Sequence, residues 1–187
     1  MTKAAMIAVV VAVVLAVAGY LAVRMVGTDR SNSPMPQVGQ MAPTFTLPNQ
    51  ENQPVSLDQY RGKWVVLYFY PKDMTSGCTI EAHNFQHDLK KFEAEDAVIL
   101  GVSVDTVESH QQFCTKDGLT FHLLADPDTK VVEEYGSLGL FETWPLTERH
   151  TFLINPKGHV GKVWTDVDKD IMHHSEQVLA AIETAKK

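Results

Sequence analysis

The chain has 187 residues and a formal net charge of −7 at pH 7. The acidic excess lies after residue 36, which argues against binding of nucleic acid, because binding to a phosphate backbone needs a basic surface. The 44% hydrophobic and 21% charged residues are ordinary globular values, and they exclude a wholly disordered chain.

The N-terminal segment is strongly apolar. Residues 4–23 carry no charge, and a helix of that length spans about 30 Å, the thickness of the bilayer core. We therefore expect residues 1–26 to be a transmembrane anchor or a signal sequence; the apolar run is long for a cleaved signal peptide. Residues 27–38 are rich in turn-forming residues and are expected to be a linker.

The same segment leads to a prediction of localisation. A short N-terminal tail usually stays inside the cell, so we expect a membrane-anchored domain, residues 39–187, on the extracytoplasmic (periplasmic) side. The alternatives are a domain on the cytoplasmic face and a cleaved, secreted form.

After the linker, short apolar runs alternate with helical stretches. Hairpins are predicted at 45–57 and 151–167, and buried strands at 64–70 and 97–104. Helices are predicted at 78–95, 106–117, 127–135 and 170–186. This alternation predicts an α/β domain of three layers with a mixed central sheet. His173 and His174 are expected at the surface, at the start of the last helix.

Cys78 stands between a buried strand and a helix. The carboxyl end of a strand is where ligand crevices form in α/β sheets, and free N–H groups in a first helical turn favour thiolate over thiol. Ser76 or Thr75 could cap this helix, and Gly77 would let a small substrate approach the backbone. The alternative from position alone is an inert buried cysteine.

The residues around Cys78 resemble a known family. Pro71, Thr75 and Cys78 fit the pattern P-x-x-x-T-x-x-C of peroxiredoxins, and YPKDMTSGCTIEA closely resembles their bacterioferritin-comigratory, or Q-type, branch. The stretches VGQMAPTFTLPNQ and ERHTFLINPKGHVGKVW resemble the same branch, so the resemblance covers roughly residues 37–187. It implies a thioredoxin-like fold preceded by a hairpin.

The resemblance also implies a chemistry. Cys78 matches the peroxidatic cysteine, whose thiolate attacks a peroxide and becomes sulfenic acid. Thr75 matches the residue whose hydroxyl bonds the thiolate and the peroxide, and Pro71 the residue that shields the cysteine from water. Arg149 matches the active-site arginine, which would favour thiolate and stabilise charge on the peroxide oxygens.

The sequence departs from the branch at two positions. Ser76 stands where proline is common, and His83 stands where many members carry a resolving cysteine. Some members place the resolving cysteine in the helix that we predict at 106–117, and Cys114 fits that position. The alternative is a one-cysteine enzyme in which Cys114 fills the core.

The resulting hypothesis is a thiol-dependent peroxidase for hydrogen peroxide and organic hydroperoxides, recycled through an intramolecular disulfide by a thioredoxin-like dithiol protein. The non-enzymatic alternative is a membrane-anchored redox sensor or thiol–disulfide module. A disulfide reductase is disfavoured because Cys78-Thr79-Ile80-Glu81 lacks a second thiol. We expect no cofactor, no metal and no nucleic-acid partner, and a monomer attached to the membrane only by its N-terminal helix.

Overall fold

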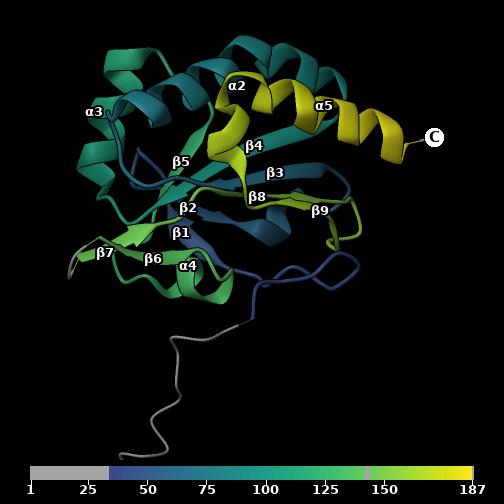
Figure 1. The fold of residues 1–187 in the computed structure, drawn as a ribbon, viewed down its shortest axis with the longest axis horizontal. Helices are drawn as coiled ribbons and strands as arrows, with labels where there is room; N and C mark the ends of the chain where they lie inside the picture. The colour runs from purple at the N-terminus through teal and green to yellow at the C-terminus, as the bar shows by residue number, and fades with distance from the viewer. Residues whose placement is uncertain (1–33, 142–143, 187) are drawn as a thin grey trace, which may run out of the picture. The chain divides into compact units, whose positions relative to one another are not determined.

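The computed structural model describes residues 34–141 and 144–186. Their centre is a five-stranded sheet in the order β5-β4-β3-β8-β9 (Figure 1). Its strands are β3 (Trp64–Phe69), β4 (Ala97–Ser103), β5 (His122–Ala125), β8 (His150–Ile154) and β9 (Val160–Trp164). β3, β4 and β5 run parallel, whereas β8 pairs antiparallel with β3 and with β9, so the predicted mixed sheet is confirmed.

Helices and a hairpin cover the two faces of this sheet. α2 (Ser76–Ala94), α3 (Val107–Asp117) and α5 (His174–Ala185) lie on one face. α4 (Lys130–Glu134) and the hairpin of β1 (Thr46–Pro48) and β2 (Pro54–Ser56) lie on the other (Figure 1). The domain therefore has the three-layer, thioredoxin-like arrangement that was predicted, with the hairpin before the first strand of the sheet.

The pattern of β3 explains the two cores. All six of its residues are buried, as expected for a strand covered on both faces. Val66 and Tyr68 pack with α2, α3 and α5, whereas Val65, Leu67 and Phe69 pack with the hairpin and α4. Successive side chains of a strand point to opposite faces, so one apolar run supplies both cores.

Several elements differ from the sequence-based prediction. The strand β5 and the hairpin of β6 (Leu138–Phe141) and β7 (Trp144–Thr147) were not predicted. Two 3-10 segments, η2 (Leu57–Tyr60) and η3 (Val167–His173), are also present, and the last α-helix begins only at His174. His174 is buried, not at the surface, because its ring packs edge-on against Phe85 and Trp164.

The predicted membrane-anchored localisation requires correction. No helix within 34–141 and 144–186 is long and apolar enough to cross a bilayer. Even α2, with 19 residues, carries charged side chains along its exposed face. This finding contradicts the expected membrane-anchored, periplasmic domain. The predicted anchor, residues 1–26, and most of the predicted linker, 27–38, lie outside the described residues.

Candidate active site

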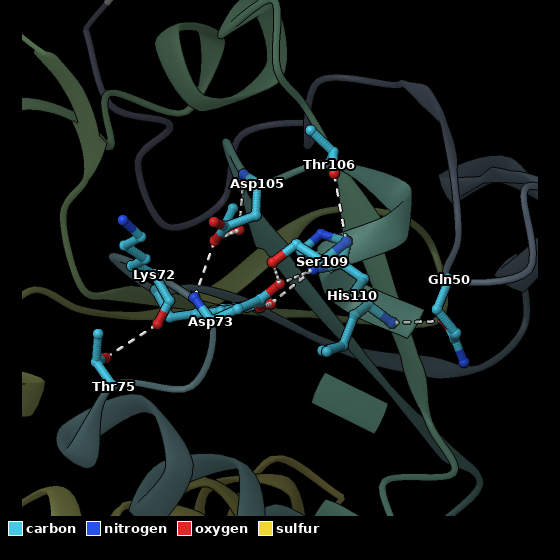
Figure 2. Close-up of polar contacts among 11 residues, drawn as sticks. Gln50, Lys72, Asp73, Thr75, Asp105, Thr106, Ser109 and His110 are labelled. Carbon is cyan, nitrogen blue, oxygen red and sulfur yellow. Dashed lines mark hydrogen bonds and ion pairs between the residues drawn. The ribbon is translucent and has the colours of Figure 1, made fainter. Parts of the chain in front are cut away.

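Cys78 lies in the first turn of α2, directly beyond the carboxyl end of β3. The side chain is 1% exposed and forms no disulfide. Thr75 precedes the helix in an extended conformation, but its side chain does not cap the helix. Its hydroxyl instead donates to the carbonyl oxygen of Lys72 at 3.0 Å (Figure 2). The loop before Cys78 is thus closed on itself by a threonine–backbone hydrogen bond.

Arg149 reaches Cys78 from the neighbouring strand. Its Nη2 donates to the Cys78 Sγ at 3.5 Å, and the arginine is 8% exposed. The contact follows from the sheet, because antiparallel pairing sets Phe69 at the end of β3 opposite His150 at the start of β8. Gly77 leaves room for the guanidinium, since a Cβ there would lie 3.2 Å from the Nη2 of Arg149. The structure therefore brings together two residues that sequence spacing alone cannot connect.

Two carboxylates complete the surroundings of Arg149. Nη1 donates to Oε2 of Glu81 at 2.5 Å, and Nε donates to Oδ1 of Asp168 at 2.7 Å. Burial lowers the pKa of Arg149, but the charges of Glu81 and Cys78 and the bond to Asp168 outweigh it and leave the pKa raised. The guanidinium beside the sulfur is therefore charged throughout the physiological pH range.

Sequence reasoning missed both carboxylates. Glu81 follows Cys78 by three positions in α2, a spacing that places two side chains on the same face of a helix. That spacing was a usable signal. Asp168 lies in η3, far along the chain, and nothing in the sequence connects it to Arg149.

Glu81 is an unusual carboxylate because it is buried. Burial raises its pKa to about 7, although the charge and hydrogen bond of Arg149 act in the opposite direction. Its second oxygen, Oε1, is buried and has no hydrogen-bond partner among the described residues. The Arg149 contact therefore accounts for only one of its two oxygens.

Pro71 and Thr75 line a pocket beside the cysteine loop. The pocket has a volume of about 610 Å³ and is mostly apolar. Its other lining residues are Lys72, Val104, Asp105, Pro145 and Leu146. Neither Cys78 nor Arg149 lines it, so the pocket adjoins the loop before Cys78 and does not contain the sulfur.

Cys114 lies in α3, away from the Arg149 cluster. It is 9% exposed, unbonded, and packed in the same core as Cys78. Burial, followed by the nearby charges of Asp73 and Glu51, raises the pKa of its thiol to about 12. Cys114 is therefore a protonated thiol in this state. His83, at the position where a resolving cysteine was considered, pairs with Asp117 at 3.1 Å.

A buried cysteine held against a charged guanidinium can attack an electrophile and keep the developing negative charge paired. No group of three or more potential metal ligands is found in the part of the chain that the structure describes. The contact between Cys78 and Arg149 fits thiol chemistry.

Comparison with known proteins agrees with this chemistry. The model of the AhpC/TSA family matches residues 38–163. Peroxiredoxin Bcp of Bacillus subtilis is 39% identical over 160 residues, which are 80% of this chain and 95% of the relative. Peroxiredoxin Bcp of Xanthomonas campestris is 40% identical over 152 residues, 78% of this chain and 94% of the relative. The chain belongs to the AhpC/TSA family.

Solved structures place this peroxiredoxin in the same branch. The bacterioferritin comigratory protein of Xanthomonas campestris, described for its alkyl peroxide reduction activity, superimposes with a TM-score of 0.70. It is 35% identical, and the match covers 76% of this chain and 92% of that chain. The protein is thus a bacterioferritin-comigratory, Q-type peroxiredoxin, a thiol-dependent peroxidase that acts through a peroxidatic cysteine.

Proposed function

We propose that Cys78 is the peroxidatic cysteine of this enzyme. The observation that carries the proposal is the 3.5 Å contact between Arg149 Nη2 and Cys78 Sγ at the start of α2. The Cys78 thiolate attacks one peroxide oxygen, so that an S–O bond forms as the O–O bond breaks. The other oxygen leaves with its electron pair and takes up a proton to give water or an alcohol, and Cys78 becomes sulfenic acid. Arg149 stabilises the charge that moves onto the oxygens.

Thr75 and Pro71 prepare the space for this attack. The Thr75 hydroxyl donates a hydrogen bond to the backbone carbonyl oxygen of Lys72, so the lone pairs of its oxygen are free to accept a hydrogen bond from the peroxide. Pro71 has no backbone N–H and presents an apolar ring next to the loop, which limits the access of water to the sulfur. Both residues act as positioning groups.

The substrates are hydrogen peroxide and organic hydroperoxides. The pocket beside Pro71 and Thr75 is lined by Val104, Pro145 and Leu146, which offer an apolar surface to the organic part of a hydroperoxide. The Xanthomonas relative described for alkyl peroxide reduction supports the same class. A hydroperoxide whose organic part binds there would lie beside the loop that leads into Cys78.

Cys114 resolves the sulfenic acid, and a thioredoxin-like dithiol protein then reduces the resulting disulfide. In the resolving step the Cys114 sulfur displaces the hydroxyl group of the sulfenic acid, and its thiol proton leaves in the water that is formed. Two solved structures of Xanthomonas campestris peroxiredoxin Q carry serine in place of one or the other of two cysteines. The spacing of those cysteines equals the spacing of Cys78 and Cys114. We also propose that the enzyme acts as a monomer, since Cys78, Glu81 and Arg149 can form the site without a residue from a second chain.

The test is peroxide consumption by the full chain, coupled to NADPH through thioredoxin and thioredoxin reductase. The wild type should turn over and Cys78→Ser should not. Cys114→Ser should show no turnover: it should consume one equivalent of peroxide to give the sulfenic acid and only stoichiometric further peroxide for over-oxidation. Mass spectrometry after one equivalent should show a peptide that joins Cys78 to Cys114. A disulfide without turnover would indicate a redox sensor, and turnover by Cys78→Ser would refute the assignment. Light scattering of the reduced protein checks the monomer.

A further inference from the structure

A buried polar cluster lies beside the two cysteines and is not used in the peroxide step. Its centre is the carboxylate of Asp73, which is 4% exposed. Oδ1 accepts from the Tyr70 hydroxyl at 2.7 Å. Oδ2 accepts from the Ser109 hydroxyl at 2.7 Å and from Nδ1 of His110 at 2.8 Å. Figure 2 shows Ser109 and His110 directed at this carboxylate.

The cluster connects the two segments that carry the cysteines. Asp73 belongs to the loop that leads into α2 and precedes Cys78 by five positions. Ser109 and His110 belong to the first turn of α3, and His110 precedes Cys114 by four positions, about one helical turn. The backbone N–H of Asp73 also donates to Oδ2 of Asp105, at 2.9 Å, in the segment before α3 (Figure 2). The cysteine loop is therefore fastened to the start of α3.

The ring of His110 is buried, and its hydrogen bonding is directed at Asp73. The residue is 0% exposed, and its Nε2 is buried with no hydrogen-bond partner among the described residues. The short contact to a carboxylate assigns a proton to Nδ1, which donates to Oδ2 of Asp73. The same nitrogen lies 3.3 Å from the Tyr70 hydroxyl oxygen, so the charge-assisted bond to Asp73 is the shortest polar contact of the ring.

The charge of Asp73 makes the cluster costly to open. Burial raises the pKa of this carboxyl, but the bonds from His110, Ser109 and Tyr70 more than compensate, and the pKa is lowered overall. Asp73 is therefore ionised at neutral pH. If α3 moves away, a buried carboxylate loses two donors and must be solvated again.

We expect the resolving step to involve such a movement. Cys78 is held by Arg149 in the first turn of α2, whereas Cys114 lies inside α3 with its thiol in the core. α2 and α3 share few close backbone contacts. A disulfide needs Cα atoms within about 7 Å and Cβ atoms that face each other. We therefore expect at least one of the two segments joined by the cluster to unwind before the sulfurs meet.

We propose that Tyr70, Asp73, Ser109 and His110 form a latch that holds α3 closed and sets the rate at which Cys114 reaches the sulfenic acid. The inference rests on the proposed role of Cys114. While the latch is closed, a second peroxide can oxidise the sulfenic acid to sulfinic acid, releasing a second water or alcohol. The strength of the latch therefore determines what fraction of the sulfenic acid forms the disulfide and what fraction is over-oxidised. Asp73 and His110 are positioning residues in this scheme.

Three substitutions should weaken the latch to different degrees. His110→Leu removes the donor to Asp73 and keeps an apolar side chain of similar size. His110→Asn keeps an N–H donor close to the position of Nδ1. Ser109→Ala removes one hydroxyl at a half-buried position, where loss of folding is not expected. Gln112→Ala is the matched control, because Gln112 is exposed on the same helix.

The first measurement needs no disulfide. In a Cys78→Ser background, the rate of alkylation of Cys114 reports how often α3 opens, because the closed thiol is buried and protonated. His110→Leu should raise this rate on the order of tenfold, since a bond to a charged group is lost. Ser109→Ala should raise it less, and His110→Asn and Gln112→Ala should stay near the parent. The alkylation rate should depend only weakly on the concentration of dilute urea, because local opening exposes little surface. Global unfolding would make the rate rise steeply with urea.

The second measurement uses the enzyme with both cysteines, mixed with peroxide without reductant. His110→Leu should form the Cys78–Cys114 bond faster and accumulate less sulfinic acid, while Cys78 is oxidised at the wild-type rate. A bond formed at an unchanged rate, with unchanged alkylation of Cys114, would overturn the latch and leave the proposed function intact. Failure of the wild type to form the bond would overturn the proposed resolving step and the latch with it.

Discussion

The Arg149 guanidinium uses each of its nitrogens at the site. Nη2 contacts the Cys78 sulfur, Nη1 contacts Glu81 and Nε contacts Asp168. A buried cation without partners would be costly, so the two carboxylates fix the arginine where the sulfur needs it. Because the guanidinium fork is rigid, fixing two nitrogens also directs the third at Cys78.

Removal of this cation should slow the chemistry of Cys78. In Arg149→Ala the Cys78 sulfur loses the guanidinium that contacts it at 3.5 Å, so alkylation of Cys78 at neutral pH should slow. Oxidation by peroxide should slow on the order of 100-fold, the usual effect of losing one donor to a developing oxyanion. The exposed Arg61, paired with Asp58, supplies the control Arg61→Ala. Unchanged rates of alkylation and oxidation of Cys78 in Arg149→Ala would show that the guanidinium does not act on the thiol.

Glu81 should make stability depend on pH. Its pKa rises from an unfolded value near 4.5 to about 7 on folding, chiefly because it is buried. The contribution of Glu81 to the free energy of unfolding is therefore fully present below the unfolded pKa. It is lost as the pH rises from that value to about 7. Glutamine does not titrate, so Glu81→Gln should not show this loss. The urea midpoint of the variant relative to that of the wild type should therefore rise between the two pKa values and stay constant above them. A difference that is constant with pH would contradict the raised pKa.

The site residues show what a sequence can and cannot reveal. Cys78, Thr75 and Pro71 lie within one short loop, so a local motif is enough to group them. Arg149 was assigned to the site only by resemblance, because its contact depends on the pairing of β3 with β8. Asp168 was missed for the same reason, since long-range contacts leave no local pattern.

At the scale of elements, strong apolar periodicity was predictive, whereas short strands were found only in part: the hairpin of β1 and β2 was predicted, and β5, β6 and β7 were not. The runs that became β3, β4 and α2 were found because each is long and apolar or amphipathic. β5 has four residues, and the β6–β7 hairpin contains Gly139 and Pro145, which are disfavoured in strands. These weak strands form because neighbouring elements offer pairing partners.

The β7 segment should influence substrate choice. Leu146 faces the pocket beside Pro71 and Thr75, so Leu146→Asp should weaken binding of cumene hydroperoxide and raise its KM roughly tenfold, the effect of losing one apolar side-chain contact. The KM for hydrogen peroxide should not change, because that substrate has no apolar part. Val38→Asp, at an exposed valine outside the pocket, is the control. Equal effects on both peroxides would argue against an organic subsite.

At the scale of the whole domain, two cores share one sheet. The helical face packs on Val66 and Tyr68 of β3, whereas the opposite face packs on Val65, Leu67 and Phe69. The domain architecture was predictable from its alternating strands and helices. The localisation was not, since it rested entirely on composition near the N-terminus and no described helix can span a membrane.

The packing of the helices on the sheet predicts which segments unwind when the enzyme is oxidised. α3 packs against β5, the edge strand of the sheet, while β3 and β4 are held from both faces. Unwinding α3 and the first turn of α2 should therefore leave the central strands in place. In hydrogen exchange, the oxidised protein should lose protection at 107–117 and 76–79 and keep it in β3 and β4. Cys114→Ser treated with one equivalent of peroxide should keep protection at 107–117, because it cannot form the disulfide. Loss of protection throughout the sheet would mean that resolution proceeds by global unfolding instead of local opening.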